Sequence, residues 1–291
     1  MKKAFTIIEL IITMVILSIV AYIASSLIAK TYIGYNHTNT VNRANLKLEI
    51  ALNEITNRLE YSIPNSIVKR KSATDTSISS ISSAPLDYEV LEWVGMAKDS
   101  FNANDTDLKP AWSGFCNIKT STKNSIVTAG SNLGLADNII HRLSDNKADF
   151  NSSNVAIFFI GEYDYQDIGY INSATNQIGI ISSYSTDRLN LANDLISISE
   201  MYKIAWSAYA VVPTNFNTTE KTFDLELRYN FRPWINEHYN DSSTPTTTLI
   251  NNVTVFKTYA TQNRVHIKLC IKDRYSLNKT TSICKEKVVF R

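Results

Sequence analysis

The sequence is poor in the residues that build most catalytic and metal sites. Its 291 residues include only 3 Cys, 4 His and 8 Gly. The histidines are scattered, with no H-x-x-x-H or C-x-x-C pair to bring two metal ligands together. The chain also lacks the glycine pattern of a phosphate-binding loop and the G-x-S-x-G of a serine hydrolase. We therefore expect no metal site, no cofactor and no enzymatic activity. The four histidines are His37, His141, His238 and His266.

An excess of charge of one sign is also lacking. There are 29 basic and 27 acidic residues, and the formal charge of +2 gives no general attraction to nucleic acid or to acidic membranes. A charged partner must therefore be recognised locally. The basic residues near the carboxy terminus make nucleic acid a possible partner, but such residues more often line a solvated strand face. They are Arg264, Lys268, Lys272, Arg274, Lys279, Lys285 and Lys287.

Long apolar segments are lacking too, apart from one at the amino terminus. Residues 5–29 contain a single charged residue, Glu9. As a helix rising about 1.5 Å per residue, this segment is long enough to cross the hydrocarbon core of a membrane. Lys2 and Lys3 precede it, so the positive-inside rule predicts that the first four residues are cytoplasmic and the remainder lies outside. We expect a single-pass inner-membrane protein with a periplasmic head.

A secretory signal peptide is the alternative interpretation of this segment, because Ala21, Ala24 and Ser26 offer small residues near its end. Glu9 argues against it. A carboxylate within an apolar run costs about 2.5 to 3.5 kcal/mol on insertion scales and is by default a functional candidate. A segment that is discarded gains nothing from such a residue.

Residues 2–10, KKAFTIIEL, resemble the cleavage motif of type IV pilins and type II secretion pseudopilins. The resemblance implies that prepilin peptidase cuts between Ala4 and Phe5 and methylates the new amine of Phe5. It also implies that Glu9 neutralises the amino-terminal ammonium of Phe5 on a neighbouring subunit during assembly. Other pilin or pseudopilin subunits and an inner-membrane assembly platform follow as partners. Ala4 stands where the family usually has Gly.

Beyond Lys30 an amphipathic helix is predicted, since apolar residues recur every three or four positions. Pro64 would stop it. The expected layout is therefore a leader at 1–4, a transmembrane and polymerisation helix at 5–29, an amphipathic helix at 30–63 and a β-rich head at 64–291. A membrane anchor followed by a separate soluble helix is the alternative. The apolar stripe comprises Val41, Ala44, Leu48, Ala51, Leu52, Ile55 and Leu59.

Alternating apolar residues predict strands in the head. We expect a long antiparallel pair over 202–212 and 223–231, and a further pair at 265–271 and 284–290. Residues 65–84 read as a connecting loop or irregular edge, and 95–154 as a long insertion. The expected fold class is α+β, with a spine helix packed against an antiparallel β-sheet head. Further strands are expected at 86–94, 155–161 and 178–184, the second of them in mid-sheet and buried on both faces.

The large J-type minor pseudopilins have a similar plan, in which a spine helix carries a head of two β-sheets. Val255 and Phe256, followed by residues 265–269, are loosely similar to their carboxy-terminal strands.

The cysteines Cys116, Cys270 and Cys284 would face an oxidising compartment in this topology. Cys270 and Cys284 are separated by 14 positions across a predicted hairpin, and we prefer a disulfide between them. Closing so short a loop contributes about 3 kcal/mol in the chain-entropy estimate. Spacing alone leaves pairing with Cys116 open.

Two acidic segments invite a chemical interpretation. Residues 99–107 hold several oxygen donors that calcium accepts, but they lack the glycine and terminal glutamate of an EF-hand, so a solvated loop is expected. Glu162, Asp164 and Asp167 follow a predicted strand, and we interpret them as a strand end and turn rather than as paired catalytic carboxylates.

The sequence is compatible with three functions. The first is a minor pilin or pseudopilin near the tip of a short periplasmic fibre in a type II secretion-like system. The second is a competence or type IV pilus minor pilin whose head binds DNA or a surface. The third, of another class, is a membrane-anchored periplasmic enzyme or binding protein.

Overall fold

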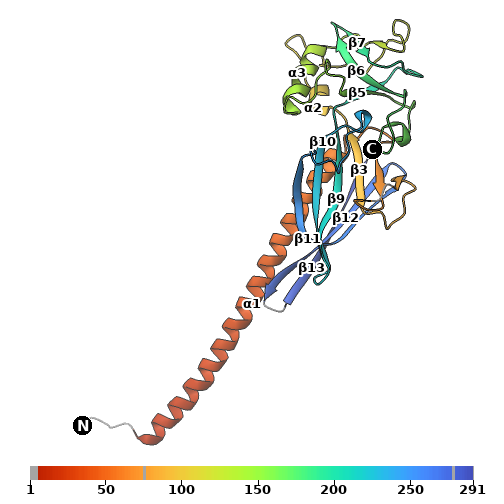
Figure 1. Cartoon of the computed structure of the whole chain (residues 1–291). Helices are drawn as coiled ribbons and strands as arrows, with labels where there is room; N and C mark the ends of the chain where they lie inside the picture. Colours follow the sequence, from red (N-terminus) through yellow and green to blue (C-terminus); the bar gives the residue numbers. More distant parts are fainter. Residues whose placement is uncertain (1–5, 75–76, 277–278, 291) are drawn as a thin grey trace.

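The computed structural model describes residues 6–74, 77–276 and 279–290. One helix, α1 (Ile7–Leu59), runs for 53 residues, about 80 Å at 1.5 Å per residue. Figure 1 shows that it projects from the head as a continuous rod. It ends a few residues before the predicted stop at Pro64, and Ser62 already bridges to Gly95 of the head.

The amphipathic stripe of α1 packs against a large antiparallel sheet. All the predicted stripe residues from Ala44 to Leu59 are buried, whereas Val41 is only partly so. They share a core with Trp93, Leu227 and Ile267 of the sheet. The expected α+β class, a long helix on an antiparallel sheet, is therefore confirmed.

In the described part of the chain the large sheet has eight strands in the order β13-β12-β11-β10-β9-β3-β1-β2. Every neighbouring pair is antiparallel. The strands are β1 (Val68–Arg70), β2 (Ile78–Ser80), β3 (Val90–Gly95), β9 (Ser207–Asn217), β10 (Thr222–Phe231), β11 (Thr246–Thr261), β12 (Arg264–Ser276) and β13 (Lys279–Phe290).

β11 joins two parts of this sheet. Its residues 246–253 pair with β10, and its residues 253–261 pair with β12. Asn252 has a φ of 59°, and the register shifts between Val253 and Val255. Left-handed residues and bulges bend a strand and increase its twist, so the sheet changes direction here. As a result α1 contacts strands on both sides of the bend, β3 on one and β12 and β13 on the other.

A second, smaller sheet lies beyond the end of α1 (Figure 1). Its described strands follow the order β4-β7-β6-β5-β8. Two helices, α2 (Lys98–Phe101) and α3 (Leu133–Leu143), accompany it, and Ala136 and Ile140 of α3 belong to its core. The strands are β4 (Ser125–Val127), β5 (Val155–Phe159), β6 (Ile178–Tyr184), β7 (Arg188–Leu191) and β8 (Tyr202–Ala205); two 3₁₀ turns, η1 (Tyr165–Asp167) and η2 (Pro233–Ile235), lie in the connecting segments.

Several strand predictions hold. β6 has the predicted bounds, and β5 lies between β6 and β8 with all of its residues buried. The single strand predicted over 202–212 is wrong, because the chain leaves the small sheet at Ala205 and enters the large sheet at Ser207. Alternation cannot reveal this break, since both strands keep the same period on either side of Trp206.

The segments expected to be irregular contain regular structure. Residues 65–84 carry β1 and β2, which form one edge of the large sheet, and the 95–154 insertion carries α2, β4 and α3. The predicted strands do not include most of β11. Its sequence is rich in Thr and Asn, and many of its side chains are exposed, so no clear apolar alternation marks it.

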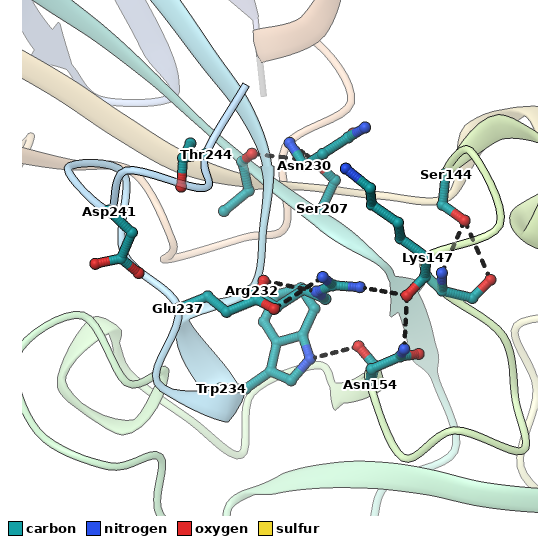
Figure 2. Close-up of polar contacts among 12 residues, drawn as sticks. Ser144, Lys147, Asn154, Ser207, Asn230, Arg232, Trp234, Glu237, Asp241 and Thr244 are labelled. Carbon is teal, nitrogen blue, oxygen red and sulfur yellow. Dashed lines mark hydrogen bonds and ion pairs between the residues drawn. The ribbon is translucent and has the colours of Figure 1, made fainter. Parts of the chain in front are cut away.

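A polar junction ties the two sheets together, as Figure 2 shows. Arg232, directly after β10, makes a bidentate pair with Glu237, in which Nε and Nη2 donate at 2.8 Å each. Its Nη1 donates at 2.7 Å to the carbonyl of Lys147, in the loop after α3. Trp234 Nε1 donates to the carbonyl of Asn154 at 2.9 Å. Because a bidentate guanidinium pair has a fixed geometry, this junction holds the small sheet to the large one.

Candidate functional site

The candidate site is the amino-terminal segment that the sequence predicts to be cleaved and assembled. Lys2, Lys3, Ala4 and Phe5, which form the predicted cleavage site and its leader, lie outside the described residues. Thr6 is the N-cap of α1, and Glu9 lies in its first turn. Both side chains are exposed.

Glu9 has a structural role within the single chain. Its Oε2 accepts hydrogen bonds from the Thr6 N–H at 3.1 Å and from the Thr6 hydroxyl at 2.9 Å. The Thr6 Oγ1 in turn accepts from the Glu9 N–H at 3.4 Å. This reciprocal arrangement is a capping box, which satisfies donors that the start of a helix leaves open. Glu9 therefore stabilises the end of α1, and its carboxylate stays accessible.

The first part of α1 is apolar and covered by nothing in the chain. It is the one helix among the described residues that is long and apolar enough to cross a membrane. None of its side chains from Ile7 to Val20 is buried, and bulky aliphatic residues cover all of its sides. An all-round apolar helix needs lipid or other apolar helices around it. Examples with at least half of their surface exposed are Ile7, Ile8, Leu10, Ile11, Ile12, Met14, Val15, Ile16, Leu17, Ile19, Val20 and Ile23.

The comparison with protein families gives a match to this segment. Residues 1–25 match the model described as the prokaryotic N-terminal methylation motif. The amino-terminal segment therefore carries the methylation motif of type IV pilin-like proteins. The motif implies processing by prepilin peptidase and assembly with other pilin subunits. The match ends within the membrane-length part of α1, so it does not separate J-type pseudopilins from other members. Comparisons with curated proteins and with solved structures gave no match to this chain.

The carboxy-terminal hairpin is attached to the part of α1 that packs against the head. Lys285 and Lys287 on β13 both pair with Glu49 of α1, at 2.9 and 2.8 Å. Lys287 also donates to the Asn53 side chain. Hydrogen bonds and charge from the two ammonium groups lower the pKa of Glu49 to about 2. A third pair joins Lys47 to Asp273 of β12 at 3.6 Å.

A disulfide joins Cys270 of β12 to Cys284 of β13, which are directly paired in the ladder with their Cα atoms 4.0 Å apart. Cys116 is a buried free thiol that donates to the Ser121 hydroxyl at 3.4 Å, and burial raises its pKa. A raised thiol pKa disfavours the thiolate that a nucleophilic cysteine needs. Cys116 lies in the core of the small sheet.

The acidic segments act as turn stabilisers in the structure. Asp105 accepts from the Asp107 and Lys109 backbone N–H groups and from the Asn132 side chain, and these donors lower its pKa. Asp164 and Asp167 form a capping box around η1. Within the described ranges, no group of three His, Cys, Asp or Glu side chains is placed to hold a metal ion.

No local sequence pattern predicts the buried ion pair between Arg70 and Glu92. Arg70 on β1 donates through Nε to Glu92 on β3 at 2.7 Å and through Nη2 to the carbonyl of Tyr170 at 2.8 Å. Burial raises the pKa of the Glu92 carboxyl, and Arg70 opposes that rise. Because the partners lie 22 and 100 positions apart, only the folded chain brings them together. The pair connects the edge of the large sheet to the segment that follows β5 of the small sheet.

Proposed function

We propose that this pilin-like protein is a minor pilin or pseudopilin, a low-copy subunit near the tip of a periplasmic fibre in a type II secretion-like system. Prepilin peptidase removes residues 1–4, α1 holds the subunit in the inner membrane, and the head faces the periplasm. The observation that carries the proposal is the combination of the methylation motif with a head that extends beyond the end of α1.

The length of the head favours a tip position. Subunits of a helical fibre stack along the fibre axis, with their spine helices side by side. The small sheet lies beyond the end of α1 (Figure 1). We infer that it takes up the space in which the head of the next subunit would sit. At the tip no subunit follows, and such a head fits without a clash. The same plan of a spine helix and two sheets is shared with J-type minor pseudopilins.

The assembly role of Glu9 follows from its position in the membrane-length part of α1. Its partner is proposed to be the methylated amine of Phe5 on the adjacent subunit. An α-amine has a pKa near 8 and is therefore largely charged at neutral pH. Pairing the two charges in lipid is far more favourable than leaving either alone, which fixes the axial register of neighbouring subunits.

A DNA-binding head receives less support. Four of the seven basic residues that pointed to it are paired within the chain: Lys285 and Lys287 with Glu49, and Lys272 and Arg274 with Glu220. Arg264 lies over the Phe290 ring. Paired cations attract phosphates less strongly than free ones, because part of their charge is already compensated.

The test is mass spectrometry of the mature amino terminus, together with the copy number of the subunit in purified fibres. We expect an amino-terminal N-methyl-Phe5 and a copy number far below that of the main subunit. An uncut chain, or one cut by signal peptidase after residue 20, would overturn the processing. A copy number equal to that of the main subunit would overturn the tip position alone.

A further inference from the structure

The edge strands of the two sheets differ in length. β2, β4 and β8 lie at three of the four edges and have 3, 3 and 4 residues. β13, at the fourth edge, has 12. Among the described residues, β13 pairs only with β12. Its other side therefore carries a row of N–H and C=O groups without a strand partner, the arrangement to which another extended chain can add.

β13 lacks several of the features that commonly protect an edge strand. Its register with β12 is regular from Phe290 to Thr280, with a shift only next to the turn at Ser276. It contains no proline. The disulfide between Cys270 and Cys284 fastens it to β12. Bulges, prolines, short length and charged side chains are the common devices against edge pairing. β13 is long and regular, and its charged residues Lys285, Glu286 and Lys287 disfavour strands that place like charges beside them.

The face of β13 that points toward α1 carries a surplus of positive charge. Lys285 and Lys287 share one carboxylate, that of Glu49, and the remaining partner, Asn53, is neutral. Two ammonium groups against one carboxylate leave one positive charge in excess. Both lysine side chains are about one third exposed, so an incoming strand can reach them.

A second copy of this chain fits this edge poorly. In a symmetric antiparallel pair, each face of one β13 continues into the same face of the other. In the registers centred on residues 285 to 287, at least one of Lys285 and Lys287 would then lie opposite a lysine of the partner copy. Like charges on neighbouring strands are destabilising, whereas opposite charges are favourable.

We propose that β13 accepts an extended acidic segment of another protein, which adds to the large sheet as a further strand. Carboxylates at alternate positions of that segment would meet Lys285 and Lys287. On the opposite face, the exposed side chains of Val288 and Phe290 offer it apolar contact. The proposal concerns a surface of the head and does not depend on the position of the subunit in a fibre.

The test uses the full chain in detergent and two synthetic peptides as long as β13. In the first, Glu alternates with Val and Thr; in the second, Lys replaces every Glu. Amide hydrogen exchange followed by mass spectrometry reports on β13. We expect the Glu peptide to slow exchange in β13, and the Lys peptide to bind about ten-fold more weakly, as several changed cross-strand charge pairs imply.

Two proline variants separate edge binding from folding. Neighbouring N–H groups of a strand point to opposite sides, so one of Ser282→Pro and Ile283→Pro removes an N–H on the open edge and the other removes a bond to β12. The variant that lacks an N–H on the open edge should keep the melting temperature of the parent chain but no longer bind the Glu peptide. Three results would overturn the proposal: no slowing with either peptide, equal binding of both, or a concentration-dependent dimer that protects β13 without peptide.

Discussion

The two halves of α1 belong to one helix and are stabilised in different ways. From Ile7 to Val20 no side chain is buried, and the residues are apolar on every side. From Ala44 to Leu59 a single stripe is fully buried beneath the sheet, while the opposite side carries mostly polar and charged groups together with the exposed Leu46 and Ile50. The first half therefore depends on lipid or other subunits, and the second depends on the head. One continuous helix therefore has an exposed part that depends on its surroundings and a buried part that contributes to the stability of the head.

The largest expected effect is the loss of fibre assembly when Glu9, in the exposed half of α1, is replaced. Replacing Glu9 by Gln retains a side chain that can complete the capping box with Thr6 but removes its negative charge. If pairing with the Phe5 amine drives assembly, Glu9→Gln should reduce incorporation into fibres about as severely as Glu9→Ala. Fibre yield and the subunit content of sheared fibres measure this. Both variants should keep the melting temperature of the head, because Glu9 has no contact with it.

Should Glu9→Gln assemble normally while Glu9→Ala does not, helix capping rather than charge would explain the residue. Thr6→Val serves as the matched control, since it removes the hydroxyl of the capping box and leaves the carboxylate.

The buried half should respond in the opposite way. Leu48→Ala removes a side chain with no exposed surface in the core between α1 and the sheet. Deleting such a side chain typically destabilises a protein by about 2 to 5 kcal/mol. Chemical denaturation of the full chain in detergent, followed by near-ultraviolet circular dichroism, measures the loss.

Leu46→Ala is the matched control for Leu48→Ala. It lies two positions away on the same helix, and 62% of its surface is exposed. The free energy of unfolding of the head should change by less than about 0.5 kcal/mol. Equal losses in the two variants would mean that α1 does not pack in the observed rotation.

The disulfide should contribute somewhat less to the free energy of unfolding than the buried Leu48 side chain does. Cys270→Ser with Cys284→Ser opens a loop of 14 residues, for which the chain-entropy estimate is about 3 kcal/mol. Thermal unfolding of this double variant, compared with that of the parent chain under oxidising conditions, measures it. Adding a reductant should lower the melting temperature of the parent chain and leave that of the variant unchanged. A parent chain that is insensitive to reductant would contradict a stabilising bond.

The smallest expected effect is the attachment of the hairpin to Glu49. Lys285 and Lys287 lower the pKa of Glu49 from 4.5 to about 2 in the folded protein. Since the folded pKa is depressed, the stabilising contribution is present above pH 4.5 and is lost as the pH falls toward 2. The difference in melting temperature between the parent chain and Glu49→Gln should therefore shrink over that window. Because the Glu49 side chain is partly exposed, the difference at neutral pH will be small and will decrease further with salt.

A difference that persists unchanged at pH 2 would show that Glu49 acts through packing of its side chain rather than through its charge. Asn53→Ala provides the comparison, because it removes a neutral partner of Lys287 and should show no such pH dependence.

Much of the spine could be predicted because its information is local. A helix has a fixed period, so the apolar positions from Ala44 to Leu59 predicted the buried face from the sequence alone. The strand at β5 was also predictable, since a fully apolar run of that length is typical of a strand covered on both faces. The head was harder. β11 is polar along much of its length, and its place between β10 and β12 depends on pairing partners that no local pattern encodes.

The break at Trp206 shows the same limit more sharply. The alternation over 202–212 continues without interruption, yet the two parts of this segment belong to different sheets. Which sheet a strand joins depends on hydrogen bonds to segments far away in the sequence, here Val155–Phe159 for β8 and Val90–Gly95 for β9. The alternation of apolar residues along the chain therefore cannot predict which sheet each strand joins.

The sequence by itself determined the amino-terminal motif, the membrane-length helix and the face by which the spine meets the head, because each depends on residues close together in the chain. Only the tertiary structure decided that the head consists of two sheets joined at Trp206 and tied by Arg232, and that β13 is left as a long open edge. These features depend on contacts between segments tens to hundreds of residues apart. Backbone pairing and burial select such contacts only when the whole chain has folded.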